Sequence, residues 1–169
     1  MEDTESRGSS WKGRAVEWLI AAQCILASKG RLNVSTPMVD DEGVDIVFNL
    51  KGTPKTLAVQ VKSRFASASL LQRRHMFRAQ IRRKVFRPRS GLYLLFVLFD
   101  DVETLNIEHV WLIPSLRFQE LTAGQTEGRR QLVFAVNIRG TKNVWFPYRC
   151  SRRDVADRIV AAIEEVHGN

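Results

Sequence analysis

The run from Leu92 to Phe99 most constrains the fold of this chain, because its residues, Leu-Tyr-Leu-Leu-Phe-Val-Leu-Phe, include no charged side chain. A strand with one face in water alternates apolar and polar residues, whereas a continuous apolar run is typical of a strand buried on both faces. The predicted element order is a helix, three strands, a helix, several strands and a final helix. This order favours a single mixed α/β domain.

Length and composition agree with one soluble domain. The 169 residues suffice to bury a sizeable core, and no apolar run approaches the roughly 18 residues that cross a bilayer. Residues 1–10 are polar and lack a secretory apolar core, so we expect a disordered tail followed by one domain over residues 11–169. Two cysteines, Cys24 and Cys150, make no metal or disulfide framework, and a reducing cytoplasm fits best.

Local signals place the remaining elements. Ser10 is a predicted N-cap for a helix over residues 11–29 that Gly30 closes. Ser151 is a predicted cap for the last helix, whose apolar stripe is Val155, Ile159, Ile163 and Val166. Strands are expected at residues 32–36, 107–113 and 131–138, and a short helix at residues 115–121.

Positive charge is concentrated in one part of the chain. The net charge is +8, and residues 46–99 contain twelve Lys and Arg but no Asp or Glu. A block of one sign creates a strong local field, for which the natural partner is a polyanion such as nucleic acid. A solvated basic helix face is the plainer alternative. A membrane surface fits less well, because this segment lacks a wide Trp/Leu face.

Within this block, residues of one kind recur every four positions. Phe77, Ile81 and Val85 form one such series, and Arg74, Arg78 and Arg82 form the other. This spacing predicts an amphipathic helix with an arginine face, ended by Pro88 and Gly91.

Two alternating segments, residues 43–50 and 56–62, flank a Lys-Gly-Thr-Pro-Lys turn and predict a β-hairpin. Side chains alternate between the two faces of a strand. Pairing centred near Gly52 brings Asp45 opposite Gln60, with Lys62 just beyond. A carboxylate, an amide and an ammonium group then share one face, which is the layout of a metal-assisted phosphodiester site.

Three short motifs together carry a family resemblance. Glu17 on the first helix, Gly43-Val44-Asp45 entering a strand, and Gln60-Val61-Lys62 on the next strand resemble the PD-(D/E)XK nuclease superfamily. The match is to its Gln variants, as in Mrr-like restriction endonucleases; archaeal Holliday-junction resolvases have Glu at the Gln position. The pattern covers roughly residues 12–115. It implies a restriction-endonuclease-like fold, in which helices flank a mixed β-sheet.

The resemblance also implies a chemistry. The expected activity is a Mg²⁺-dependent (or Mn²⁺-dependent) endonuclease that hydrolyses DNA phosphodiester bonds in a restriction, repair, junction-resolving or mobile-element context. Mg²⁺ prefers hard oxygen ligands and keeps several waters, so few protein ligands suffice. Asp45, Glu17, the Gln60 side chain and the Val61 carbonyl are the implied metal ligands, and Lys62 holds or deprotonates the attacking water. Glu17, Asp45, Gln60 and Lys62 are thus the implied catalytic residues.

The implied partner is duplex or branched DNA, held through contacts that position the phosphate backbone without specifying sequence. The residues expected to make these contacts are Arg64, Arg73, Arg74, Arg78, Arg82, Arg83 and Lys84. Because cutting both strands of a duplex usually needs two active sites, a homodimer is a reasonable expectation.

Other interpretations of the same residues stay open. Glu17 also fits a structural ion pair, Asp45 fits a turn or capping residue, and Gln60 and Lys62 are unremarkable on an exposed sheet face. Gln60 also removes one negative charge from the site, so metal affinity should be lower than with two strand carboxylates. The alternative function is a catalytically inactive nuclease-fold module that binds nucleic acid; a structural partner in a defence complex is a third class.

Overall fold

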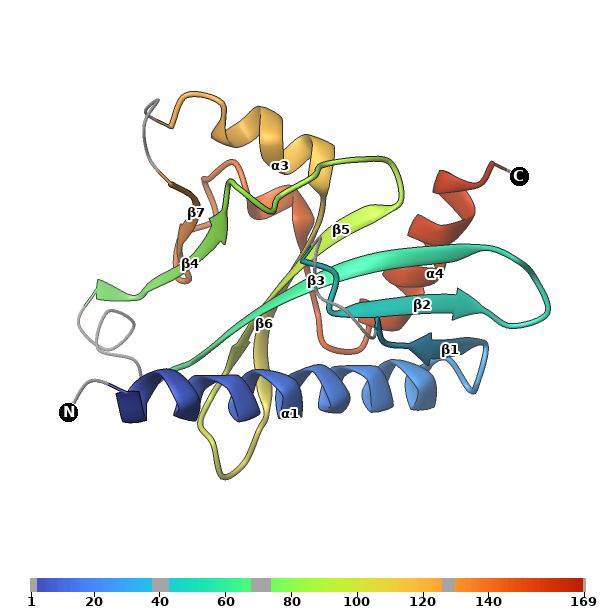
Figure 1. Ribbon diagram of the computed structural model, residues 1–169, viewed down its shortest axis with the longest axis horizontal. Coiled ribbons are helices and arrows are strands. Elements are labelled where there is room, and N and C mark those ends of the chain that lie inside the picture. The colour runs from blue at the N-terminus through green and yellow to red at the C-terminus, as the bar shows by residue number, and fades with distance from the viewer. Residues whose placement is uncertain (1–2, 38–42, 68–73, 126–129, 169) are drawn as a thin grey trace.

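A mixed six-stranded sheet with the strand order β1-β2-β3-β5-β6-β8 organises the molecule (Figure 1). The computed structural model describes residues 3–37, 43–67, 74–125 and 130–168, and only the backbone of residues 3–10. β3 and β5 are parallel, whereas the other neighbours in this sheet are antiparallel. The strands are β1 (Leu32–Ser35), β2 (Ile46–Leu50), β3 (Thr56–Phe65), β5 (Leu92–Phe99), β6 (Ile107–Pro114) and β8 (Arg149–Cys150).

β5 is buried along its whole length, as its apolar run predicts. Tyr93, Leu95, Val97 and Phe99 belong to one hydrophobic core, and the alternate residues Leu94, Phe96 and Leu98 belong to a second core. The sheet therefore separates two cores, and β5 contributes to both. This arrangement confirms a single α/β domain with a mixed sheet flanked by helices.

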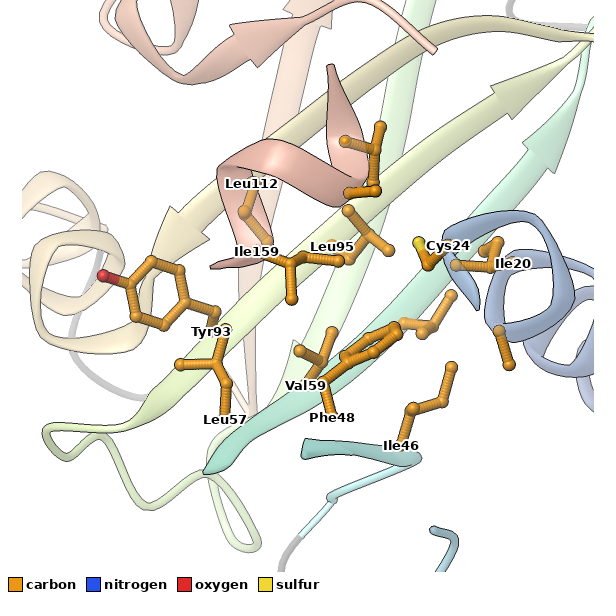
Figure 2. Close-up of a cluster of buried hydrophobic side chains, with 14 of the residues drawn as sticks. Ile20, Cys24, Ile46, Phe48, Leu57, Val59, Tyr93, Leu95, Leu112 and Ile159 are labelled. Atoms are coloured by element: carbon orange, nitrogen blue, oxygen red, sulfur yellow. The ribbon is translucent and has the colours of Figure 1, made fainter. Parts of the chain in front are cut away.

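The helices α1 (Asp3–Ala27) and α4 (Val155–Val166) cover one face of the sheet. Figure 2 shows Ile20 and Cys24 of α1 and Ile159 of α4 packed toward Val59 and Leu95. Burial of Val155, Ile159 and Ile163 confirms the apolar stripe of the last helix. Its N-cap residue is Asp154 rather than Ser151, whose hydroxyl instead donates to Asp154 Oδ2 at 2.6 Å.

A two-stranded antiparallel ribbon, β4 (Met76–Arg82) paired with β7 (Gln131–Asn137), covers the other face together with α3 (Ser115–Thr122). The predicted arginine-faced helix is therefore wrong. Along β4, Phe77, Ala79 and Ile81 are buried and the intervening residues are exposed, which is the period of a strand. Residues four positions apart share a face both in an α-helix and in a β-strand, so this spacing alone does not distinguish the two. Pairing with β7, which is distant in sequence, makes this segment a strand.

Two further boundaries differ from the sequence-based expectation. α1 begins at Asp3, so Ser10 lies inside the helix and is not its N-cap, and residues 3–10 are helical where a disordered tail was expected. The 3-10 helix η1 (Phe146–Tyr148) and β8 were not predicted, because they are too short to show a period. Among the described residues, no helix is both long and apolar enough to cross a membrane.

Candidate active site

The site lies where β2 begins beside the middle of β3. The strand register pairs Ile46 with Val59, as the hairpin prediction requires, and the Asp45 N–H donates to the Val59 carbonyl at 3.0 Å. β2 begins at Ile46, so among the described residues no strand neighbour accepts the next N–H of β3 in line, that of Val61. The Asp45 carboxylate takes that place, because its Oδ2 accepts from the Val61 N–H at 2.6 Å.

Gly43 allows the chain to approach β3 closely. Its φ of +68° lies in the left-handed region that L side chains rarely adopt, and a Cβ at this position would lie 2.5 Å from Gln60 Nε2. The glycine therefore meets both a backbone and a packing requirement. Its closeness to the Gln60 amide places the Gly-Val-Asp entry directly against the middle of β3.

Gln60 and Lys62 share one face of β3. Gln60 is paired with Leu94 and Lys62 with Phe96, and both of these β5 side chains belong to the core under the β4–β7 ribbon. Gln60 is buried with 7% of its surface exposed, whereas Lys62 is half-buried. The alternative of an exposed sheet face is therefore wrong for Gln60, whose amide lies close to Gly43.

Glu17 reaches the same region from α1. Its side chain is 16% exposed and Oε2 lies 3.1 Å from Arg14 Nη1. Burial raises the pKa of Glu17 above its ordinary value, the negative charge of Asp45 raises it further, and Arg14 and Lys62 act in the opposite direction. Glu17 therefore lies in the electric field of both Asp45 and Lys62. The structure therefore brings Asp45, Gln60 and Lys62 together and places Glu17 close enough for its pKa to depend on the charges of Asp45 and Lys62.

Arg14 is the contributor that sequence reasoning missed. It lies three residues before Glu17 on the same helix, a spacing that brings side chains together, and this signal was available in the sequence. The ion pair is exposed on the Arg14 side, with 59% of that side chain in water. It therefore only partly offsets the cost of the buried carboxylate.

The oxygen donors of the site fit a small hard cation. The N–H and C=O of one strand residue point to the same side, so the Val61 carbonyl oxygen points to the side of β3 on which Asp45 accepts the Val61 N–H. Two carboxylates, one amide oxygen and one carbonyl oxygen suit Mg²⁺, which keeps several waters. A cation between Glu17 and Asp45 would relieve the repulsion that raises the pKa of Glu17. Within the described ranges, no three His, Cys, Asp or Glu side chains form a metal-binding cluster.

Two histidines, His109 and His167, make contacts away from this constellation. The His109 Nδ1 lies 2.6 Å from Arg149 Nη2, and burial together with this guanidinium lowers the pKa of His109 to about 4. His167 Nε2 lies 2.8 Å from the Thr56 carbonyl oxygen, at the opposite end of the hairpin from Asp45.

The basic residues are distributed over several elements. Arg64 follows Lys62 by two positions on β3 and is exposed, with Nη1 donating to the Ser63 carbonyl at 2.9 Å. Arg78 and Arg82 lie on the outer face of β4, and Arg74, Arg83 and Lys84 lie just before and after this strand. Arg73 lies outside the described residues. The arginines therefore do not form the expected helical face.

Neither a family model nor a curated protein matches this chain. The chain is similar to the solved structure of a bacterial homing endonuclease, I-Ssp6803I, with 22% sequence identity and a TM-score of 0.48. The alignment covers 86% of this chain and 93% of that chain. The residues of the site therefore carry the functional proposal.

Proposed function

We propose that this protein is a metal-dependent endonuclease of the PD-(D/E)XK type, in its Gln-containing Mrr-like form, acting on DNA. The observation that carries this proposal is the convergence of Asp45, Gln60 and Lys62 at the β2–β3 junction with Glu17 in their field. A bound cation between these two partly buried carboxylates would offset part of the electrostatic cost of placing them together.

Hydrolysis adds water across a P–O bond, so a water oxygen bonds to phosphorus and the departing sugar oxygen gains a proton. Glu17, Asp45, Gln60 and the Val61 carbonyl would hold Mg²⁺ or Mn²⁺, which when bound would supply charge neutralisation and a more acidic water. Lys62 positions the attacking water and stabilises the negative charge of the pentavalent transition state. The Asp45 carboxylate also accepts the Val61 N–H, so it holds the β3 backbone in place and supplies negative charge to the site.

The decisive test is cleavage of supercoiled plasmid and of branched DNA with Mg²⁺ or Mn²⁺. We expect Asp45→Asn and Lys62→Ala each to reduce the rate by about 100-fold or more. Asn retains an oxygen acceptor for the Val61 N–H, so the variant loses charge rather than the backbone bond. Lys51→Ala, on the exposed hairpin turn, is the matched control and should cleave normally. Absence of cleavage by the wild type, or activity that survives both changes, would refute the assignment.

A non-catalytic DNA-binding module is the second candidate. It is favoured by the use of Asp45 as the acceptor for a backbone N–H, which is a structural role. In either case Arg64, Arg74, Arg83 and Lys84 grip phosphates, and gel shifts across a salt series test this. Lys84→Ala should reduce the slope of log affinity against log salt by about 1, whereas Arg153→Ala should not change it. A salt-independent affinity would contradict phosphate binding.

A homodimer is proposed because cleavage of both strands needs two such sites. Three large apolar side chains of α1 support pairing with a second copy, since Trp11, Trp18 and Leu26 are 60%, 57% and 76% exposed. Spacings of seven and eight residues place them along one side of the helix. Sedimentation of the wild type and of Trp18→Glu tests this pairing. A monomeric wild type at working concentrations would refute it.

A further inference from the structure

The β4–β7 ribbon has two chemically different faces. Phe77, Ala79 and Ile81 point into the core and are fully buried, whereas Arg78, Gln80 and Arg82 point outward and are exposed. The residues directly across the ribbon from these three are Ala135, Val133 and Gln131. Neither strand contains Asp or Glu. The outer face therefore presents two guanidinium groups and an amide beside short or neutral neighbours.

These three side chains are available for a partner. In the part of the chain that the structure describes, no hydrogen bond or ion pair engages the side chain of Arg78, Gln80 or Arg82. Arg83, just after the strand, is different, because its Nη2 donates to the Gln125 carbonyl at 3.0 Å. The side chains without such a contact, those of Arg78, Gln80 and Arg82, are therefore the alternate residues of β4 that point outward.

The ribbon itself is held firmly. The Gln125 side chain bonds both backbone groups of Val133, as Nε2 donates to its carbonyl and Oε1 accepts from its N–H, each at 2.7 Å. A side-chain amide in this position occupies part of the outer edge of β7 and opposes pairing with another strand. The ribbon is therefore a rigid platform for its outward side chains.

The spacing of these side chains matches DNA. Alternate residues of an antiparallel strand lie about 6.8 Å apart, which is about two base-pair steps of B-DNA. The major groove, about 12 Å wide, admits a two-stranded ribbon. Arginine donates two hydrogen bonds to guanine O6 and N7, and glutamine makes a matching pair with adenine N6 and N7. An Arg-Gln-Arg series on one strand face fits base edges better than it fits phosphates alone.

We propose that the β4–β7 ribbon enters the major groove and reads bases through Arg78, Gln80 and Arg82, a role that rests on the proposed action on DNA. The favoured sequence has an adenine flanked, about two base pairs away on each side, by guanine. The ribbon covers the sheet face toward which Lys62 points, since Lys62 pairs with Phe96 of the core beneath it. One duplex can then contact the ribbon and the proposed catalytic residues together.

The test selects bound sequences from a library of random duplexes, using the full chain with Ca²⁺ in place of Mg²⁺. The wild type should enrich the spaced guanine-adenine-guanine pattern. Arg78→Lys and Arg82→Lys keep the charge but lose the paired donors, so each should lower the ratio of specific to random-duplex affinity about 10-fold and relax one guanine position. The salt slope should stay unchanged in both variants. Gln80→Ala should relax the adenine position.

Arg153→Lys, an exposed arginine before α4, is the matched control and should leave the selected sequences unchanged. Duplex binding without enrichment, or variants that weaken specific and random duplexes equally, would overturn base reading while leaving DNA as the substrate. Absence of any duplex binding would overturn the proposed substrate itself, and base reading with it.

Discussion

Gly43 and Gln60 lie so close together that the Gln60 side chain leaves no room for a side chain at position 43. Gly43→Ala introduces a side chain at φ +68° and places its Cβ 2.5 Å from Gln60 Nε2. The left-handed backbone should cost about 1–2 kcal/mol, and displacement of the buried amide about 1–3 kcal/mol more. Urea unfolding of the variant measures this loss.

Gly52→Ala provides the control for backbone strain alone. Its φ is +79°, but a Cβ at Gly52 would meet no atom within 4 Å. We therefore expect this variant to lose only the backbone contribution, about 1–2 kcal/mol. The packing contribution at Gly43 should disappear in the Gly43→Ala, Gln60→Ala double variant. Equal losses at Gly43 and Gly52 would show that the contact with Gln60 has no energetic consequence.

Glu17 determines a pH dependence of stability. Because burial and Asp45 raise its pKa above 4.5, the folded protein holds this proton more tightly than the unfolded chain does. The stability that comes from protonated Glu17 is fully present below the pKa of Glu17 in the unfolded chain. It is lost as the pH rises through the pKa of Glu17 in the folded protein. Gln at position 17 carries no titratable proton, so Glu17→Gln should not lose stability as the pH rises. The difference in free energy of unfolding between Glu17→Gln and the wild type should therefore shift in favour of the variant from below pH 4.5 to neutral pH.

Glu108→Gln, at an exposed position on β6, should follow the wild-type pH curve. Cleavage assays on the same proteins separate folding from catalysis, because Glu17→Gln should be inactive although it is relatively more stable at neutral pH. A Glu17→Gln curve parallel to that of the wild type would argue that the carboxylate is already neutralised by its neighbours.

At the scale of elements, the β4–β7 ribbon depends on one amide at its edge. Gln125→Ala removes both hydrogen bonds to Val133 and should destabilise the protein by about 1–2 kcal/mol. Faster amide hydrogen exchange at Val133 is the local measurement. Gln119→Ala, an exposed residue of α3, is the control and should change neither quantity. Unchanged exchange at Val133 in Gln125→Ala would show that the amide does not hold the edge.

At the scale of the whole molecule, β5 couples two cores, because alternate residues of this strand belong to each. Leu95→Ala removes a side chain from the α1–α4 core and should cost about 2–5 kcal/mol, and Phe96→Ala in the ribbon core about 3–5 kcal/mol. Phe96 stacks on Phe134 with ring centroids 4.0 Å apart, so its loss also removes an aromatic contact across to β7.

Both variants should unfold in a single transition. When Trp11 and Trp18 are replaced by Phe, the remaining Trp111 and Trp145 report on the ribbon core by fluorescence, and circular dichroism reports on the whole chain. Their midpoints should coincide in the wild type and in each variant. A fluorescence transition that precedes the loss of secondary structure in Phe96→Ala would show that the ribbon core unfolds independently of the sheet.

Elements whose residue pattern has one interpretation could be predicted before the fold was known. The apolar run Leu92–Phe99 can only be buried on both faces, and the hairpin turn around Gly52 sets a register that aligns Asp45 with the middle of β3. These local signals were sufficient to assemble Asp45, Gln60 and Lys62, because residues close in sequence are aligned by a short turn.

Features that depend on partners distant in sequence became visible only in the folded molecule. Phe77 and Ile81, four residues apart, fit a helix or a strand equally, and pairing with β7 more than fifty residues later made them a strand. The same pairing turned an expected arginine helix into an outward Arg78, Gln80 and Arg82 series. Glu17 likewise acquired its raised pKa from packing of α1 near β2 and β3, since burial and the charge of Asp45 exist only in the folded chain.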